Sequence, residues 1–329
     1  MTGGTEPHRI WFEREPPEIY HALLDGTAVI AGSGARDSSP LSGVAGAHAV
    51  IASSRVQYDA DFMDRAPSLR VISRTGIGLD NVRIPEATER GIAICHTPGA
   101  PTISTAEHAF ALLLACAKAL PQTARAMRAG PEDFFNTYDG IELDGLCLGI
   151  VGLGQIGRRV ARFAQAIGMR VVAFDPLLGP AEASELRVTL TSTLEALLAE
   201  ADAVSLHAPL TPGTMRLMDE RRIGLMRPGA ILINTARGGL VDEPALAAAL
   251  EAGHLRSAGL DVFEVEPPHP DNPLLHRDDV IATPHIAGAT AAGRDRLWRT
   301  AIAQALQVLA DERPPGLANP EVWTAGGAR

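Results

Sequence analysis

The sequence predicts an α/β protein with two doubly wound parallel-sheet domains. Short β-branched runs alternate with helical segments along almost the whole chain, a pattern typical of parallel sheets covered by helices. The runs fall into two groups, which a loop at residues 97–101 containing two prolines separates. A chain of 329 residues is long enough for each group to form a core of its own.

The first group of runs predicts a complete small domain. Its expected strands are Ile10–Phe12, Ala28–Ala31, Ala49–Ala52, Val71–Ser73 and Ala93–Cys95. Helical segments such as Pro16–Leu24 and Asp59–Arg65 separate these strands. After the loop, Ser104 or Thr105 is expected to cap a long helix over Ala106–Ala119, because serine and threonine are favoured N-cap residues.

The second group of runs begins with that helix and extends to about Thr283. Its expected strands are Cys147–Val151, Arg170–Phe174, Ala203–Leu206, Ala230–Asn234, Ala258–Asp261 and Val280–Ala282. A last long helix, Thr290–Ala310, lies beyond the sixth strand, which already completes a sheet of this type. We therefore expect this helix to pack on the first domain and to make that domain discontinuous.

The most informative feature is a glycine motif, Gly152-Leu-Gly154-Gln155-Ile156-Gly157. It lies between the strand Cys147–Val151 and a segment patterned as a helix over Arg158–Ile167. Asp175 closes the next strand, about 20 residues further on. Glycines at these spacings between a strand and a helix, followed by such an acid, predict a dinucleotide-binding unit.

The glycine motif and Asp175 also indicate which dinucleotide is bound. Gly152 permits a tight turn, Gly154 lets the backbone approach a pyrophosphate, and Gly157 lets the helix pack closely on the strand. The N-terminus of that helix attracts phosphate groups. Asp175 can accept hydrogen bonds from both ribose hydroxyls, and it would repel a 2′-phosphate. No cation follows it before Arg187, so the predicted cofactor is NAD rather than NADP.

Three later strands end in charged residues. Arg237 follows Ala230–Asn234, the acids Asp261, Glu264 and Glu266 lie at or beyond the end of the next strand, and His285 follows Val280–Ala282. Carboxyl ends of parallel strands form the edge where doubly wound sheets bind ligands. An arginine holds a carboxylate through a bidentate fork. A histidine beside an acid donates or accepts a proton. This combination suits hydride transfer to a 2-oxo acid.

These segments resemble those of the D-isomer-specific 2-hydroxyacid dehydrogenases, the family that includes D-3-phosphoglycerate dehydrogenase and hydroxypyruvate/glyoxylate reductase. The resemblance covers about residues 51–309 in order and spacing. The matching segments are Arg74–Val82, Ser104–His108, the glycine motif, His207–Pro212, Asn234–Asp242, Gly259–Pro268 and Thr283–Thr290. One departure is Phe134-Phe135, which stands where many relatives carry a tryptophan.

The resemblance implies roles for individual residues. Arg237 would bind the substrate carboxylate, His285 would be the acid/base, and Glu266 would be its acidic partner. The implied cofactor-binding residues are Gly152, Gly154, Gln155, Ile156, Gly157, Asp175, His207, Ala208, Pro209, Thr214, Thr235, Ala236, Asp261 and Gly288. The implied substrate-binding residues are Arg74, Gly76, Ile77 and Gly78.

The resemblance also implies an organisation for the chain. It places a substrate domain at residues 1–98 and 288–329 around an NAD-binding Rossmann domain at residues 99–287. It further implies a homodimer, in which the helix Ala106–Ala119 and the segment after it make most of the contact. The substrate would be a small 2-oxo or 2-hydroxy acid.

Composition and residue spacing argue against several other classes of function. A net charge of -10 and a pI near 5.5 argue against nucleic-acid and membrane-surface binding, which need a basic face. The stretch Ala106–Leu120 is too short and too polar to span a bilayer. Cys95, Cys116 and Cys147 form no CxxC pair and lie in apolar segments, so we expect buried, reduced thiols in a cytoplasmic protein. No His, Cys or carboxylate spacing indicates a metal site.

The residues leave alternatives open. A formate- or phosphite-type dehydrogenase on the same fold is disfavoured by Glu266, because formate dehydrogenases use a glutamine near the histidine. An NAD(H)-sensing, corepressor-like protein is disfavoured only in part, because such relatives keep the three charged residues. Ser53 replaces an arginine of phosphoglycerate dehydrogenases, although Arg55 is close and Arg74 is retained, so a phosphate on the substrate is left open. We predict an NAD-dependent D-2-hydroxyacid dehydrogenase.

Overall fold

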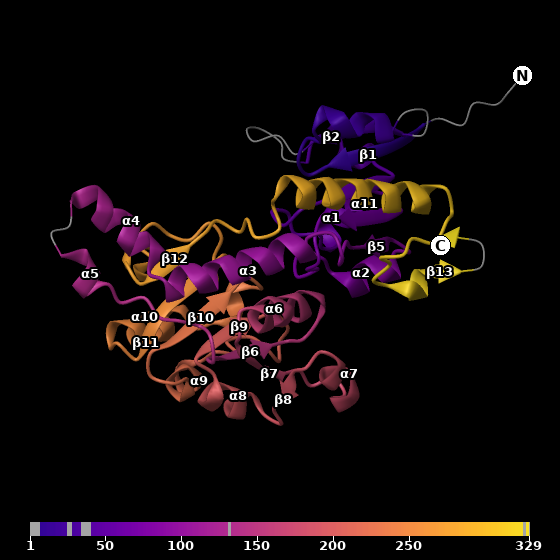
Figure 1. The fold of residues 1–329 in the computed structure, drawn as a ribbon. Coiled ribbons are helices and arrows are strands. Elements are labelled where there is room, and N and C mark those ends of the chain that lie inside the picture. Colours follow the sequence, from indigo (N-terminus) through magenta and orange to yellow (C-terminus); the bar gives the residue numbers. More distant parts are fainter. Residues whose placement is uncertain (1–6, 25–27, 34–40, 131–132, 325–326, 329) are drawn as a thin grey trace, which may run out of the picture. The chain divides into compact units, whose positions relative to one another are not determined.

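The computed structural model describes residues 7–24, 28–33, 41–130, 133–324 and 327–328. The chain divides into two compact units, Met1–Pro101 with Ala291–Arg329, and Thr102–Thr290. Figure 1 shows that each unit contains its own sheet with helices packed on it. The predicted fold class is therefore confirmed, including the first unit's assembly from two separate stretches of chain.

The first unit is built on a five-stranded parallel sheet in the order β2-β1-β3-β4-β5. Its strands are β1 (His8–Phe12), β2 (Ala28–Ser33), β3 (Ala49–Ala52), β4 (Val71–Arg74) and β5 (Ala93–Cys95). All residues of β3, β4 and β5 are buried. Strands covered on both faces read as continuous apolar runs, which is why their positions agree with expectation.

Short helices and one long helix cover this sheet. They are η1 (Glu18–Leu23), η2 (Val44–Gly46), α1 (Ala60–Asp64), α2 (Ile84–Glu89), α11 (Ala291–Leu309) and η5 (Pro320–Val322), with a short antiparallel pair β13 (Trp323–Thr324) and β14 (Gly327–Ala328). Helix α11 buries Ala301, Ile302 and Ala305 in one cluster with strand residues such as Ile51. It also accepts a 2.8 Å hydrogen bond from Ser73 Oγ at Ala301 O.

The second unit is built on a seven-stranded parallel sheet in the order β12-β11-β10-β9-β6-β7-β8. Its strands are β6 (Cys147–Val151), β7 (Arg170–Phe174), β8 (Thr189–Leu190), β9 (Ala203–Leu206), β10 (Ala230–Asn234), β11 (Leu255–Leu260) and β12 (Val280–Ala282). From β6 the sheet is extended in one direction by β7 and β8 and in the other by β9 to β12, so the order of the strands reverses between β6 and β9. In such sheets a ligand binds at this switch point, beyond the carboxyl ends of the strands.

The helices of the second unit are α3 (Thr102–Ala117), α4 (Leu120–Ala129), α5 (Phe134–Thr137), α6 (Gln155–Ala166), α7 (Pro180–Glu185), α8 (Leu194–Glu200), α9 (Glu220–Leu225), η3 (Gly238–Leu240), α10 (Glu243–Glu251) and η4 (Pro273–His276). The expected cap of α3 is wrong. The helix begins at Thr102, directly after Pro101, so Ser104 and Thr105 are buried within it. Ser104 Oγ instead contacts Thr290 Oγ1 at 2.7 Å.

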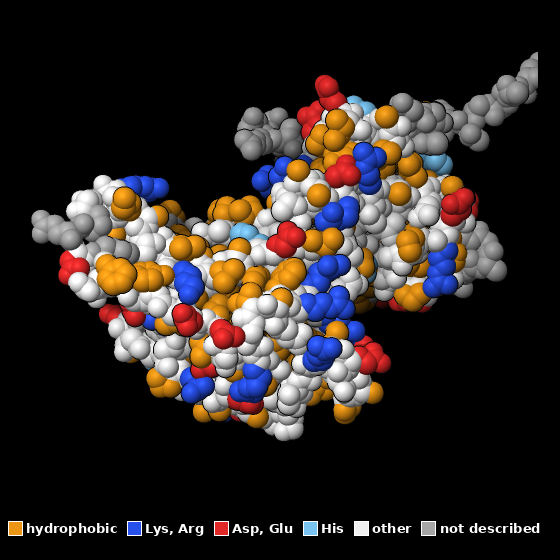
Figure 2. Space-filling view, viewed as in Figure 1, with side chains coloured by type: hydrophobic (Ala, Val, Ile, Leu, Met, Phe, Trp, Pro, Cys, Tyr) orange, Lys and Arg blue, Asp and Glu red, His pale blue; other side chains and the backbone are white. Residues whose placement is uncertain are grey.

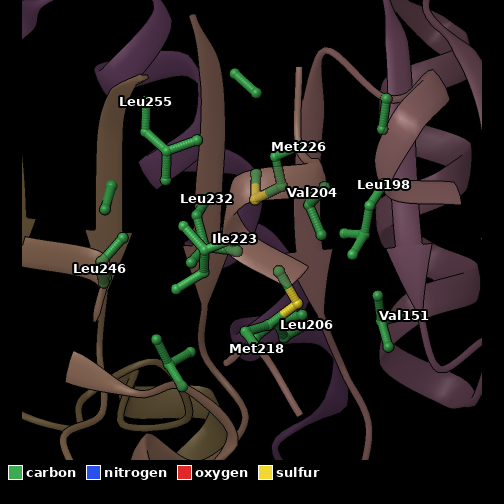
Figure 3. Packing of buried hydrophobic residues seen from close by; sticks show 14 of the residues in the cluster. Val151, Leu198, Val204, Leu206, Met218, Ile223, Met226, Leu232, Leu246 and Leu255 are labelled. Atoms are coloured by element: carbon green, nitrogen blue, oxygen red, sulfur yellow. The ribbon is translucent and has the colours of Figure 1, made fainter. Parts of the chain in front are cut away.

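Two apolar clusters cover the two faces of the second sheet. Residues alternate between them along each strand: Val151 belongs to one cluster, whereas Leu148 and Ile150 belong to the other. Figure 3 shows the first cluster, in which strand residues such as Leu232 lie among side chains such as Ile223 from the covering helices. Each fully buried leucine or isoleucine contributes about 1.5–3 kcal/mol, so the strands that carry the site are rigidly held.

The remaining expectations concern thiols and membranes. Cys95, Cys116 and Cys147 are buried and unpaired, as expected. Burial raises the pKa of these thiols to about 12, 12 and 11, so they carry no thiolate at neutral pH. Among the described residues, no helix taken singly is long and apolar enough to cross a membrane. Among the described helices, the pair α3 and α4 reaches the required length and hydropathy when taken together, but the two helices are bent by 54° relative to each other.

Candidate active site

The three glycines of the loop between β6 and α6 have different surroundings. Gly152 has a φ of +91°, and a Cβ there would lie 2.8 Å from the backbone of His207. A Cβ on Gly157 would lie 2.3 Å from the carbonyl oxygen of Gly152. Around Gly154, no described atom beyond its chain neighbours lies within 4 Å of that position. The loop therefore needs glycine at 152 and 157 for packing, and it is open at 154, beside the N-terminus of α6.

Asp175 follows β7 and is tied to this loop. Its Oδ2 accepts the N–H of Leu153 at 2.9 Å, and its Oδ1 accepts the N–H of Leu177 at 2.9 Å. A carboxylate has about four acceptor positions, so both oxygens can also accept from ribose hydroxyls. Sequence reasoning missed Arg158, which donates from Nε to Leu153 O at 2.9 Å and pairs with Glu182. An anion and a cation thus fix the loop at Leu153.

The segment after β9 lies against the glycine loop. The N–H of His207 donates to Val151 O at 2.7 Å, and its ring Nε2 is 2.9 Å from Ser205 Oγ. Loss of hydration lowers the pKa of His207 to about 4, so the ring is neutral at pH 7 and is a poor proton donor. Thr214 Oγ1 donates to Pro209 O at 2.7 Å and closes the following turn.

A buried hydroxyl follows β10. Thr235 is 7% exposed, and its Oγ1 has no hydrogen-bond partner within the described part of the chain. Leaving such a group unpaired costs about 1–3 kcal/mol, so Thr235 suits contact with a polar group of a ligand. Together with the open backbone at Gly154 and the acceptors of Asp175, this unpaired hydroxyl fits a dinucleotide at the carboxyl edge of the sheet.

Glu266 and His285 meet beyond the ends of β11 and β12. His285 Nδ1 lies 2.6 Å from Glu266 Oε2, and Glu266 Oε1 accepts the N–H of Phe263 at 3.2 Å. Burial raises the pKa of Glu266, but the hydrogen bond and charge of His285, the Phe263 N–H and the charge of Arg237 outweigh burial and lower the pKa overall. Glu266 is therefore ionised at neutral pH. Because a carboxylate accepts the Nδ1 proton, Nε2 of His285 is the ring atom that remains for proton exchange.

Arg237 is held close to the segment that carries Glu266. Its carbonyl oxygen accepts Asn234 Nδ2 at 2.9 Å. At the next residue, Gly238, a Cβ would lie 1.8 Å from the backbone carbon of Phe263. The two backbones are therefore in direct contact, and only glycine permits this approach. Sequence reasoning saw the glycine beside Arg237 but had no signal for its partner.

Asp261 is fully buried and holds the loop that carries His285. Its Oδ1 accepts the N–H of Ile286 at 2.9 Å, its Oδ2 accepts the N–H of Ala287 at 2.8 Å, and its carbonyl oxygen accepts the N–H of His285 at 2.8 Å. His285 has a φ of +52°, a left-handed conformation that non-glycine residues adopt only when their surroundings enforce it. The sequence linked Asp261 to the cofactor, and the structure adds this contact with the histidine loop.

The neighbouring acid has a different partner. Glu264 Oε1 is 3.4 Å from Arg216 NH2, and the N–H of Glu264 donates to Glu243 Oε1 at 2.5 Å. Of the two acids in this segment, only Glu266 contacts the histidine. Over the described ranges, no group of three or more His, Cys, Asp or Glu side chains is arranged to hold a metal ion.

The first unit contains the residues implied for the substrate. Thr97 donates to Gly76 O from its N–H at 2.9 Å and from Oγ1 at 3.2 Å, and His96 Nδ1 is 3.0 Å from Ile77 O. In a trans peptide the C=O and the following N–H point in opposite directions. The N–H groups of Ile77 and Gly78 therefore point away from His96 and Thr97. His96 and Thr97 thus hold the Gly76–Gly78 loop, a contact that sequence reasoning missed.

Two further polar groups support this side of the first sheet. Arg74 is 6% exposed and donates from Nε to Asn81 Oδ1 at 3.1 Å. Its NH1 lies 3.3 Å from the position of a Cβ on Gly76, so the guanidinium lies beside the Gly76 loop. Sequence reasoning also missed Glu13, a buried acid after β1 that accepts the N–H of Ser53 at 2.6 Å. Its position directly after an apolar strand was the feature of the sequence that could have indicated it.

Comparison with known proteins identifies the family. Residues 110–287 match the family model described as D-isomer specific 2-hydroxyacid dehydrogenase, NAD binding domain. The chain belongs to this family. The predicted family and the predicted cofactor, NAD, are thereby confirmed.

Individual relatives cover different shares of the chain. This chain is 43% identical over 242 residues to D-3-phosphoglycerate dehydrogenase from Archaeoglobus fulgidus. The matched stretch is 74% of this chain but 46% of that protein. The chain is 41% identical over 267 residues to glyoxylate reductase from Korarchaeum cryptofilum, which covers 80% of each. The crystal structure of Aquifex aeolicus D-lactate dehydrogenase complexed with NAD and lactic acid has a TM-score of 0.84 at 29% identity, covering 92% of this chain and 96% of that one. The chain spans about half the length of the phosphoglycerate dehydrogenases it matches.

Proposed function

We propose that the protein transfers a hydride between NAD(H) and a D-2-hydroxy acid or the corresponding 2-oxo acid. The observation that carries this proposal is the 2.6 Å contact between His285 Nδ1 and Glu266 Oε2, at the sheet edge where Arg237 also lies. A histidine that has a fixed anionic partner and a free second nitrogen is equipped for acid/base catalysis. A carboxylate-binding arginine beside it fits an acid substrate.

The glycine loop, Asp175 and Thr235 would hold the cofactor. Helix α6 would direct its N-terminus toward the phosphates, and the Asp175 carboxylate would accept from the ribose hydroxyls. The bound nicotinamide supplies or accepts the hydride. Ala208, Ala236 and Gly288 lie on the loops after β9, β10 and β12 and would line the cofactor without side-chain hydrogen bonds.

His285 moves the proton. In reduction it donates the Nε2 proton to the substrate oxygen as the carbonyl carbon is reduced, while Nδ1–H stays hydrogen-bonded to Glu266. In oxidation, the neutral ring accepts the hydroxyl proton at Nε2. The Glu266 carboxylate stabilises the doubly protonated ring and holds its orientation in both directions.

The substrate acid would be held by charge and by backbone amides. Arg237 would bind the carboxylate of the substrate through its guanidinium. In the first unit, the N–H groups of Ile77 and Gly78, with the cation of Arg74 beside them, form an anion-binding group of the kind that successive backbone amides make. We propose that this group takes part in binding the acid substrate.

A homodimer formed through α3, α4 and α5 accompanies this proposal. No residue of α4 is buried, Met127 is 76% exposed, and Phe135 in α5 is 93% exposed. Figure 2 shows hydrophobic side chains at the surface of these helices. Apolar surface of this kind supports a protein contact. Sedimentation velocity on the wild-type protein tests this assembly, and a monomer at all concentrations contradicts it.

The decisive experiment is NADH oxidation with a panel of 2-oxo acids: glyoxylate, hydroxypyruvate, pyruvate and phosphohydroxypyruvate. We expect turnover of at least one, its loss in His285→Ala, and a D-configured product. NADH binding by His285→Ala should be unchanged, because the glycine loop and Asp175 are intact. A protein that binds NADH but reduces none of these acids contradicts the proposal.

A further inference from the structure

A histidine that the proposed mechanism does not use is linked to the loop of His285. His108 lies in α3, with its side chain 22% exposed. Its Nε2 is 3.0 Å from Thr283 Oγ1 and 3.6 Å from Asp261 Oδ1. Thr283 Oγ1 in turn is 2.5 Å from Asp261 Oδ1. Three polar side chains therefore connect α3 to the start of the loop that carries His285.

The number of protons in this chain fixes its direction. The Asp261 carboxylate can only accept, so Thr283 must use its single hydroxyl proton to donate to Asp261. Thr283 Oγ1 then has only lone pairs left for His108, so the His108 nitrogen must be the donor. His108 therefore carries a proton on Nε2, and the chain runs from Nε2–H to Oγ1–H to Oδ1.

The receiving carboxylate controls the conformation of the loop. Asp261 binds the N–H groups of Ile286 and Ala287, and its carbonyl oxygen binds the N–H of His285. These contacts enclose the residue with the left-handed φ of +52°. A Thr283 hydroxyl fixed by a donor on one side and an acceptor on the other is held in one rotamer. Without the donor, the hydrogen bond to Asp261 is the one remaining contact of this pair that holds the rotamer, so the rotamer is less firmly fixed.

We propose that His108 is a positioning residue for His285, acting through Thr283 and Asp261. The inference rests on the proposed function in that His285 is taken as the acid/base. His108 touches neither reacting atoms nor Glu266. Its N–H keeps the Thr283–Asp261 contact closed, and this contact keeps the loop in the conformation that directs Nδ1 of His285 at Glu266.

A second contact from the same helix provides a matched control. Ser104 lies one helical turn before His108, and its hydroxyl contacts Thr290 Oγ1 at 2.7 Å. This hydrogen bond also joins α3 to the segment after β12, whereas the Asp261 carboxylate is bound by Thr283, Ile286 and Ala287. If only attachment of the helix matters, losing either contact has the same effect. If the network matters, only the contact of His108 affects catalysis.

The test compares His108→Leu, His108→Gln and Ser104→Ala, with kcat, KM and NADH affinity measured for each. Leucine removes the donor, and we expect kcat to fall by about tenfold or more, the scale of a small misplacement of a catalytic group. NADH affinity should stay within about twofold, because the glycine loop is untouched. Glutamine retains an N–H donor and should recover most of kcat. Ser104→Ala should behave as wild type.

Several results would overturn the inference. Wild-type kcat in His108→Leu would do so, as would equal losses for leucine and glutamine, which would indicate packing alone. Thr283→Val keeps the shape but removes the hydroxyl, so its effect should not add to that of His108→Leu. Additive losses would show that the two residues act separately.

NMR of the histidine ring nitrogens separates this inference from the proposed function. We expect His108 to show the Nε2–H tautomer and His108→Gln to leave the ring signals of His285 in place, whereas His108→Leu should shift them. Unchanged His285 signals in His108→Leu overturn the positioning role, whether or not the protein reduces a 2-oxo acid. Absence of turnover in the wild type, with the expected NMR changes, would contradict the proposed function alone.

Discussion

Glu266→Gln tests the central pair, because it removes the charge while keeping the size of the side chain. The carboxylate lies 2.6 Å from His285 Nδ1, and the two side chains are 35% and 41% exposed. Two unit charges 4 Å apart attract by about 4 kcal/mol at an effective dielectric constant of 20. Exposure screens a pair of this kind to about 1 kcal/mol or less. That energy corresponds to a displacement of the pH profile by up to about 0.7 unit.

The sign follows from which form of His285 is active. Reduction needs the protonated ring, and removing the anion favours the neutral ring. The pH at which reduction falls to half its maximum should therefore move down by up to about 0.7 unit, and the rise of oxidation should move down with it. The assay is kcat/KM against pH in both directions, with Glu264→Gln as the matched control because Glu264 contacts Arg216 instead. A Glu266→Gln profile that coincides with wild type would refute the pairing.

Three further predictions concern the substrate, the cofactor and stability. Arg237→Ala should lower kcat/KM by an amount that corresponds to several kcal/mol of lost transition-state binding, while NADH affinity stays nearly unchanged. Arg237→Lys should restore little activity, because lysine lacks the planar guanidinium fork. Wild-type kinetics in Arg237→Ala would exclude the assignment. Wild-type kcat/KM should favour NADH over NADPH by at least about 100-fold, or about 2.7 kcal/mol, and Asp175→Ala should shrink that ratio; equal use of both cofactors by the wild type would contradict the role of Asp175. Because the folded-state pKa of His207 is lowered to about 4 from 6.5, the unfolded chain binds an extra proton between these values, so stability is lost as pH falls through this window, by up to about 3 kcal/mol. Urea unfolding at several pH values should show a smaller loss for His207→Gln, and parallel curves would argue against it.

The fold follows closely from the apolar pattern, and the exceptions have physical reasons. The bounds of β6, β7, β9, β10 and β12 agree with expectation, because the largely apolar runs of a parallel sheet stand out from the helical segments between them. β8, Thr189–Leu190, is too short to have a pattern. β11 starts earlier than expected because Arg256 interrupts its apolar run. The start of α3 was misplaced because a hydroxyl cap was expected at Ser104 or Thr105, whereas the helix begins directly after Pro101.

The candidate site was predictable where sequence position determines spatial position. β10, β11 and β12 are neighbours in the sheet, so the residues that follow them, Arg237 and His285 among them, gather at one edge. The contacts that orient these residues were not predictable in the same way. The link from His108 to Asp261 joins a helix to a loop with no periodic relation in the sequence. Likewise, the need for glycine at 238 arises from a backbone contact that only the folded chain contains.

The double attachment of Asp175 has a consequence for redesign of the cofactor preference. The carboxylate that would discriminate between the two nicotinamide cofactors is also the acceptor for two backbone N–H groups, at Leu153 and Leu177. Replacing it to admit a phosphorylated ribose would leave both donors without an acceptor, and asparagine would place an amide N–H against one of them. A variant that accepts NADPH therefore needs a second substitution that restores an acceptor near Leu153. Selectivity and loop rigidity cannot be altered independently at this position.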